Sequence, residues 1–179
     1  MTKMITRNHK QWVQENVFMN ILPYSPDWDE RIEALLDISM GPGRRARVAE
    51  RLRESNQQIS EFAFIMVSPE NELLATISFW PISIGSQPAL LLGPLAVTTN
   101  YQGQGVGQTL MNHALNETDK DQSRGLIVLL IGDLPYYKKS GFEVAPSGIS
   151  MPGPVDLRRL LVRGEASRIA ALKGPVGIL

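Results

Sequence analysis

A long apolar run that ends in regularly spaced glycines constrains the fold more than any other feature of this sequence. The run ALLLGPLAV, residues 89–97, predicts a strand that is buried on both faces. Glycines at every second position of residues 103–107 follow it, and the next segment predicts a helix that ends near Thr118. A second apolar run, residues 126–131, predicts another buried strand. Because strand–helix–strand crossovers join parallel strands with a right-handed turn, we expect these two strands to be parallel neighbours in one sheet.

The segments around this unit predict a mixed sheet with flanking helices. Residues 62–67 and 73–80 are separated by the turn SPENE and are expected to form an antiparallel hairpin. Further strands are expected at 17–22, from Phe142 and at 160–162, helices at 25–39, 44–54 and around 135–140, and a loop at 81–88. The fold class is therefore α/β (α+β), with six to seven strands in one mixed central sheet.

Length and composition indicate one folded domain. The 179 residues are enough for a substantial core. We expect residues 1–16 to be an N-terminal extension, residues 17–146 the core, and residues 147–179 a C-terminal segment that completes the same domain. No segment has the length and hydrophobicity of a signal peptide or a membrane span, so we expect a cytoplasmic protein without a membrane partner.

Residue usage excludes several kinds of site. Without cysteine, the chain has no disulfide, thiolate zinc site or cysteine nucleophile, and its two histidines argue against a histidine-rich metal site. We therefore expect no metal. Lysine plus arginine (18) equals aspartate plus glutamate (18), which argues against a nucleic-acid partner because such partners require excess positive charge.

The glycines between the strand and the helix indicate a phosphate site. A helix that begins directly after a strand offers free backbone N–H groups and the positive end of its dipole. Glycines let an anion approach that backbone closely, whereas one or two would suffice for a tight turn. The spacing G-x-G-x-G does not fit the dinucleotide fingerprint G-x-G-x-x-G, and no lysine completes a Walker A loop.

Proline inside the preceding strand indicates what else the ligand carries. Gly93-Pro94 interrupts the apolar run, and a proline there is expected at a bulge or an edge. A bulge would free backbone groups of Leu95, Ala96 and Val97, which an extended amide-bearing chain could pair with. A ligand with both a pyrophosphate and an amide chain is coenzyme A.

These residues resemble the GCN5-related N-acetyltransferase (GNAT) superfamily. Its signature, Gln/Arg-x-x-Gly-x-Gly/Ala at a strand-to-helix junction, matches the segment QGQGVG, residues 102–107. The segment GDLPYYKKSGF, residues 132–142, and the lead-in LGPLAV are similar to a bacterial subgroup of predicted acetyltransferases. The two motifs and the element order cover roughly residues 17–145. The resemblance implies the GNAT fold and acetyl-CoA as co-substrate.

The resemblance also implies roles for individual residues. Leu95 and Val97 would pair with the pantetheine arm, and the Val97 N–H would polarise the thioester carbonyl. Tyr137 would be the general acid that protonates the departing thiolate, with Tyr136 as the alternative. Asp133 stands where many family members have an asparagine that contacts the cofactor. The pyrophosphate would lie on the backbone of Gln102, Gly103, Gln104, Gly105, Val106 and Gly107.

The sequence does not identify the acceptor or the general base. Glu61, Asp27 and Glu30 are possible bases, but each fits a surface charge better, and no base is assigned. Five arginines lie within residues 44–53. Most fit a solvated helix face, and Arg44 or Arg45 are the best candidates to hold an acidic group of the acceptor.

The sequence therefore predicts an acetyl-CoA-dependent N-acetyltransferase that moves an acetyl group directly to a primary amine of a small molecule. The alternatives are an acyl-CoA-binding sensor or scaffold without catalysis, and an acetyltransferase for protein or aminoacyl-tRNA. The resemblance also allows a homodimer, which is frequent in the family.

Overall fold

The computed structural model describes residues 19–120 and 125–179. The expected extension, 1–16, and the first residues of the strand expected from Val17 lie outside the described residues. The strands are β1 (Asn20–Pro23), β2 (Phe64–Val67), β3 (Leu73–Ile84), β4 (Gln87–Val97), β5 (Val128–Ile131), β6 (Glu143–Val144), β7 (Ile149–Ser150), β8 (Leu160–Arg163) and β9 (Gly174–Ile178). The α-helices are α1 (Asp29–Met40), α2 (Val48–Arg51), α3 (Val106–Lys120), α4 (Leu134–Tyr137) and α5 (Ala166–Ala170), with short 3-10 turns between them.

The mixed sheet is confirmed, and it is more branched than predicted. Seven strands follow the order β1-β2-β3-β4-β5-β8-β6, and β9 pairs with both β3 and β7. The predicted hairpin β2–β3 is antiparallel. The predicted crossover is confirmed as well, because β4 and β5 are parallel neighbours.

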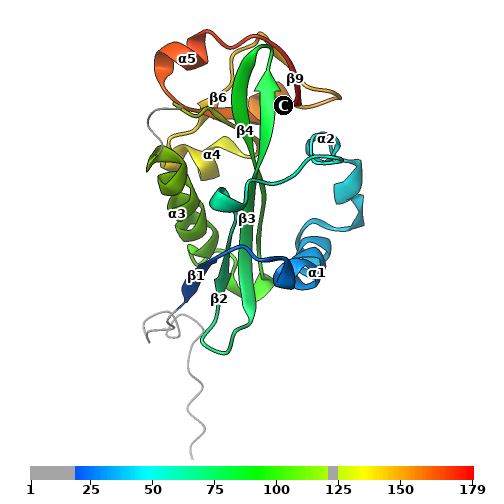
Figure 1. The fold of residues 1–179 in the computed structure, drawn as a ribbon, viewed down its shortest axis with the longest axis vertical. Helices are drawn as coiled ribbons and strands as arrows, with labels where there is room; N and C mark the ends of the chain where they lie inside the picture. The colour runs from blue at the N-terminus through cyan, green and yellow to red at the C-terminus, as the bar shows by residue number, and fades with distance from the viewer. Residues whose placement is uncertain (1–18, 121–124) are drawn as a thin grey trace, which may run out of the picture.

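Helices cover both faces of the sheet (Figure 1). On one face α3 buries Leu110, Met111 and Ala114 against β2, β3, β4 and β5. On the other face α1 packs Leu35 and Leu36 against β4. Figure 1 shows α3 on one side of the strands and α1 and α2 on the opposite side. The continuous burial of β4 from Ala89 to Pro94 follows from this two-sided cover.

Two local predictions were wrong near the prolines and glycines of the chain. The loop expected at 81–88 is instead a strand pair, because β3 continues to Ile84 and β4 begins at Gln87. Ile82 and Ile84 are fully buried, so the alternation of strand side chains continues past Pro81. Gly85, at φ 57°, lies in the two-residue turn between the strands.

The prediction of an arginine-rich helix at 44–54 was also wrong. The segment forms a 3-10 turn over Pro42–Ala46 and the single turn α2. Only Val48 and Leu52 bury apolar side chains there, which is too short an apolar stripe to fix a long helix.

The C-terminal segment contains three strands and α5, whereas one strand was expected. Among the described residues, no helix has the length and hydrophobicity needed to cross a bilayer.

Candidate active site

The site begins where β4 and β5 separate. The two strands pair only at Leu90 with Val128 and at Leu91 with Leu129. β4 then continues to Val97, whereas β5 ends at Ile131 and pairs along its whole length with β8 on its other edge. Beyond Leu91, the edge of β4 that faces β5 has no strand partner among the described residues. A gap in the sheet therefore opens toward the carboxyl ends of two parallel strands.

A bulge in β4 sets which backbone groups face this gap. Ile77 pairs with Leu95 and Phe79 with Leu92, so two residues of β4 lie opposite one residue of β3. Those residues are Gly93 and Pro94, which are joined by a cis peptide bond. The Gly93 carbonyl accepts a hydrogen bond from the Trp80 indole at 2.7 Å. The bulge expected at this proline is therefore present.

After the bulge, alternate N–H groups of β4 point to opposite edges. The Thr98 N–H donates to the Leu74 carbonyl on the β3 side, at 2.8 Å. Since the direction alternates along a strand, the N–H groups of Leu95 and Val97 point toward the gap, and that of Ala96 points toward β3. The Ala96 side chain is buried against α1. The structure thus brings Leu95 and Val97 to the gap and leaves Ala96 outside it.

The glycine loop, residues 102–107, lies near the C-terminal end of β4 and leads into the first turn of α3. Gly103 and Gly105 have φ values of 72° and 86°, which favour glycine, and no atom lies within 4 Å of where a Cβ would stand. Among the described residues, no backbone or side-chain group accepts a hydrogen bond from the N–H groups of residues 103–107. Gln102 and Gln104 instead use their side-chain amides to donate to the carbonyls of Val97 and Asn100. The loop thus presents free donors at a helix N-terminus, which is the geometry of an anion cradle.

Two tyrosines of α4 close the gap from the β5 side. A Cβ on Gly107 would lie 2.7 Å from the Tyr136 hydroxyl and 3.1 Å from the Val97 side chain. Tyr136 therefore reaches from the end of β5 to the first turn of α3. Its ring lies edge-on to that of Tyr137, with centroids 4.9 Å apart. The structure brings Val97, Gly107 and both tyrosines together.

Packing holds the Tyr137 ring at the gap. Its other edge contacts Phe142, at 5.9 Å between centroids, and Phe142 is almost fully buried. Gly132 lies directly beside the ring, because a Cβ there would be 2.2 Å from its Cε2 atom. Burial raises the pKa of Tyr137 to about 12, and the neighbouring Tyr136 and Asp133 add to the shift. Tyr137 is therefore a protonated phenol at neutral pH, as a proton donor must be.

The Asp133 side chain forms its ion pair away from the group made by Val97, Gly107 and the two tyrosines. Its side chain is three-quarters exposed and forms an ion pair with Arg159 at 3.1 Å. Its backbone carbonyl accepts hydrogen bonds from the N–H groups of Tyr136 and Tyr137 and so anchors the first turn of α4. A cofactor contact by Asp133 stays a prediction.

A cavity of about 540 Å³ adjoins the gap on the α1 and α2 side. Leu95 and Tyr137 line it together with the bulge residues of β4. Its charged lining residues come from α2 and its flanks and from the segment before β8. They are Arg47, Glu50, Arg51, Arg53, Asp156 and Arg159. A volume of this size suits a small molecule.

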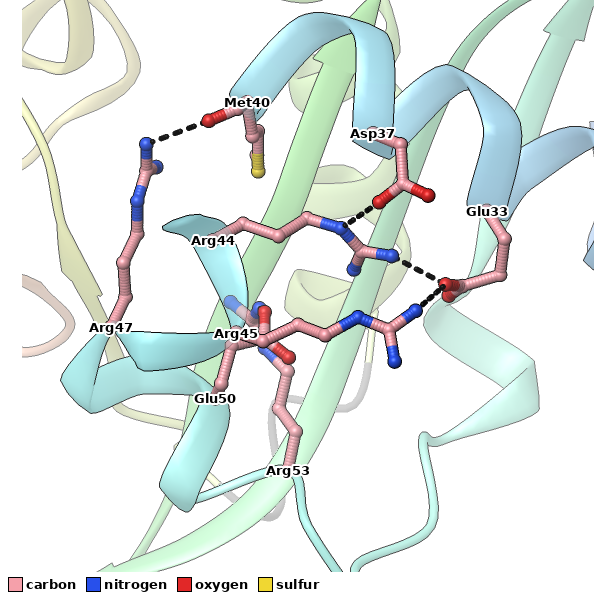
Figure 2. A network of polar contacts seen from close by, with 8 residues as sticks. All are labelled: Glu33, Asp37, Met40, Arg44, Arg45, Arg47, Glu50 and Arg53. Carbon is pink, nitrogen blue, oxygen red and sulfur yellow. Dashed lines mark hydrogen bonds and ion pairs between the residues drawn. The ribbon is translucent and has the colours of Figure 1, made fainter. Parts of the chain in front are cut away.

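Arg44 and Arg45 do not line this cavity. Figure 2 shows their guanidinium groups directed at the carboxylates of α1. Arg44 is buried and pairs with Glu33 and with Asp37, the latter at 2.8 Å. Arg45 is exposed and lies 3.5 Å from Glu33. The prediction that one of these two holds an acidic group of the acceptor was therefore wrong for Arg44, whose role is to attach the segment to α1.

The candidate bases considered from the sequence do not reach the cavity either. Asp27, Glu30 and Glu61 are exposed and are absent from its lining. Glu50 lies in the lining, with only 19% of its side chain exposed, and pairs with Arg53. Sequence reasoning missed Glu50 because nothing in its local pattern shows that α2 faces the end of β4. No group of three or more potential metal ligands occurs among residues 19–120 and 125–179.

Comparison with known proteins shows which family this architecture resembles. Residues 59–144, from the turn before β2 to the end of β6, match the model of the acetyltransferase (GNAT) domain. The uncharacterized N-acetyltransferase YhbS of Escherichia coli K12 is 27% identical over 116 residues, which are 64% of this chain and 67% of YhbS.

Solved structures share the fold. The structure of YhbS from Escherichia coli in complex with CoA superposes with a TM-score of 0.75 at 22% identity, covering 93% of this chain and 92% of that one. A GNAT family acetyltransferase from Brucella melitensis in complex with acetyl-CoA gives a TM-score of 0.55 at 23% identity, covering 86% and 99%. Residues 59–144 are thus similar to the GNAT acetyltransferase domain, and the chain has the fold of the solved GNAT N-acetyltransferases.

Proposed function

We propose that this protein transfers the acetyl group of acetyl-CoA directly to a primary amine of a small molecule. The observation that carries the proposal is the gap between β4 and β5, with free N–H donors of the glycine loop at its end and Tyr137 on its β5 side. The YhbS and Brucella melitensis structures with CoA and acetyl-CoA support the choice of co-substrate.

The glycine loop would bind the pyrophosphate. Its donors at residues 103–107 have no other acceptor among the described residues, and the open space at Gly103 and Gly105 lets phosphate oxygens approach the backbone. The pantetheine arm would lie along β4 and pair with Leu95 and Val97. Acetyl-CoA supplies the activated acetyl thioester.

The chain's own groups would then act on the thioester. The Val97 N–H would donate to the thioester oxygen, where negative charge develops as the amine attacks. The new C–N bond forms at the carbonyl carbon, and the C–S bond breaks. Tyr137 would give its phenolic proton to the departing sulfur and recover one from solvent. The surplus proton of the amine would pass to water or to a carboxylate of the cavity.

Calorimetric titration with acetyl-CoA and with free CoA tests the co-substrate. We expect the unmodified protein to bind both and Gly105→Glu to lose binding. Gly105→Gln is the matched control, because it imposes the same strain at positive φ without the negative charge. Retained binding in Gly105→Gln and loss in Gly105→Glu would show that an anion lies on the loop. No binding to the unmodified protein would refute the proposal.

Thiol release in the presence of a panel of amines tests the reaction itself. We expect Tyr137→Phe to keep acetyl-CoA affinity and to lose transfer. Binding without transfer to any amine would favour the sensor or scaffold, and transfer only to peptides or aminoacyl-tRNA would favour the macromolecular alternative. A cytoplasmic location and a homodimer are further proposals from the sequence, tested by cell fractionation and by light scattering.

A further inference from the structure

The charges that line the 540 Å³ cavity do not balance one another. Arg53 is matched by Glu50, and Arg159 is matched by Asp133. The cavity's remaining carboxylate, Asp156, is matched by Arg158, which lies outside the lining, at 2.8 Å. After these pairs are set aside, two cations of the lining are left.

The two are Arg47 and Arg51, and neither forms an ion pair with any residue that the structure describes. Arg47 donates one hydrogen bond to the carbonyl of Met40, at 3.2 Å (Figure 2). Arg51 donates one to the carbonyl of Pro152, at 3.0 Å. A guanidinium has five N–H donors, so each retains most of its hydrogen-bonding capacity. The two guanidinium groups thus bring uncompensated positive charge and free donors to one cavity.

Local structure places the two arginines at the two ends of α2. Arg47 is the extended residue that precedes the helix, and Arg51 is the last residue of the helix. The hydrogen bond of Arg47 ties it to the end of α1, and that of Arg51 ties it to the loop before β8. They therefore reach the cavity from opposite flanks.

We propose that the acceptor carries a carboxylate or phosphate in addition to its amine, and that Arg47 and Arg51 bind this anionic group. The inference rests on the proposed function, since it identifies the cavity as the acceptor site. Tyr137 and Leu95 line the same cavity, so the amine end of the acceptor faces β4 and the anionic end faces α2. Arginine suits both anions because its planar fork binds two oxygens at once.

Matched pairs of amines test this preference. The pairs are n-propylamine with β-alanine, phenethylamine with phenylalanine, and ethanolamine with O-phosphoethanolamine. Thiol release gives kcat/KM for each compound, and calorimetry gives its affinity with and without CoA present. We expect at least one acid-bearing member to exceed its neutral partner by about tenfold or more, since hydrogen bonds to charged groups are the stronger ones. The carboxylate pairs and the phosphate pair distinguish the two anions.

Variants assign the preference to the two arginines. Arg47→Ala and Arg51→Ala are expected to lower the affinity for the preferred acid about tenfold and to leave its neutral partner unchanged. Both side chains are exposed at the cavity mouth, so the fold should survive. Arg45→Ala is the matched control, because Arg45 is an exposed arginine of the same segment that faces Glu33.

The outcomes separate this inference from the function on which it rests. If acetyl-CoA does not bind, the proposed function fails, and the calorimetric arm still measures the anion preference without CoA. If the acids bind and react no better than their neutral partners, the inference is overturned while the acetyltransferase assignment stands. An acid preference that survives in the Arg47→Ala/Arg51→Ala double variant would also overturn it.

Discussion

Replacing Gly132 with alanine is expected to move the Tyr137 ring away from the gap. A Cβ at position 132 would lie 2.2 Å from Cε2 and 2.8 Å from Cδ2 of that ring. Ordinary contacts begin at 3.4 Å, so the ring must retreat by about 1.2 Å, the difference between 3.4 and 2.2 Å. The backbone of Gly132 is not in the left-handed region, so the effect comes from the contact with Tyr137 and from a weaker one with the Leu130 side chain, at 3.0 Å.

The expected loss of rate follows from that displacement. A misplacement of about 1 Å in a catalytic group costs on the order of 100-fold in rate. The same overpacking should lower the free energy of unfolding by about 1–3 kcal/mol. The affinity for acetyl-CoA should change little, because the glycine loop and β4 lie on the other side of the gap.

Three measurements check this prediction: kcat by thiol release, acetyl-CoA affinity by calorimetry and the free energy of unfolding in urea. Gly164→Ala is the control, since a Cβ there would meet its nearest neighbour at 3.4 Å. A Gly132→Ala variant with unchanged kcat, alongside a Tyr137→Phe variant that has lost it, would refute the reasoning. In that case the position of the phenol seen here is not the one from which it acts.

Three further outcomes are expected from the same structure. Arg44→Ala should lower the free energy of unfolding, measured in urea, by about 1–3 kcal/mol, because it leaves Glu33 and Asp37 without their buried partner. The loss is not larger because these half-exposed carboxylates are solvated once the arginine is gone. Arg45→Ala should change it by less than about 0.5 kcal/mol, and equal effects would contradict this account. Because the Tyr137 pKa is raised to about 12, the phenol loses its proton only at very alkaline pH. The transfer rate should therefore not fall between about pH 8 and pH 10, and a decline in that range that Tyr137→Phe abolishes would count against the assignment. Trp80→Phe should cost about 1 kcal/mol of unfolding free energy, because the indole N–H no longer satisfies the Gly93 carbonyl at the bulge.

The elements that the sequence predicts correctly are those with strong local signals. The apolar runs of β4 and β5 and the glycines before α3 each fix a structure through neighbouring residues, so the crossover and the loop could be placed. The bulge was predictable for the same reason, since Pro94 lacks an N–H for the ladder.

The cavity could not be predicted because it depends on contacts between distant segments. Arg47 and Arg51 have the same local surroundings as Arg44 and Arg45, and only the position of α1 decides which pair is matched by carboxylates. The sequence pointed to Arg44 or Arg45, and Arg44 is instead buried against the carboxylates of α1. β9 was missed because GPVGI has a weak strand pattern, and its pairing with β3 spans about half of the chain.

The pairing of β9 has a consequence for the integrity of the protein. One edge of β3 is covered by three segments in turn. β2 pairs with its first part, and β9 pairs with it from Ile82 to Ile84. Between them, the Ile59 N–H donates a hydrogen bond to the Phe79 carbonyl, and the Asn56 side-chain amide donates one to the Pro81 carbonyl. A truncation before Gly174 would therefore uncover the edge of β3 from Ile82 to Ile84. Exposed edges of this kind recruit strands from other molecules. We therefore expect β9 to protect the protein from aggregation. Its removal should reduce solubility before it affects the chemistry at the gap.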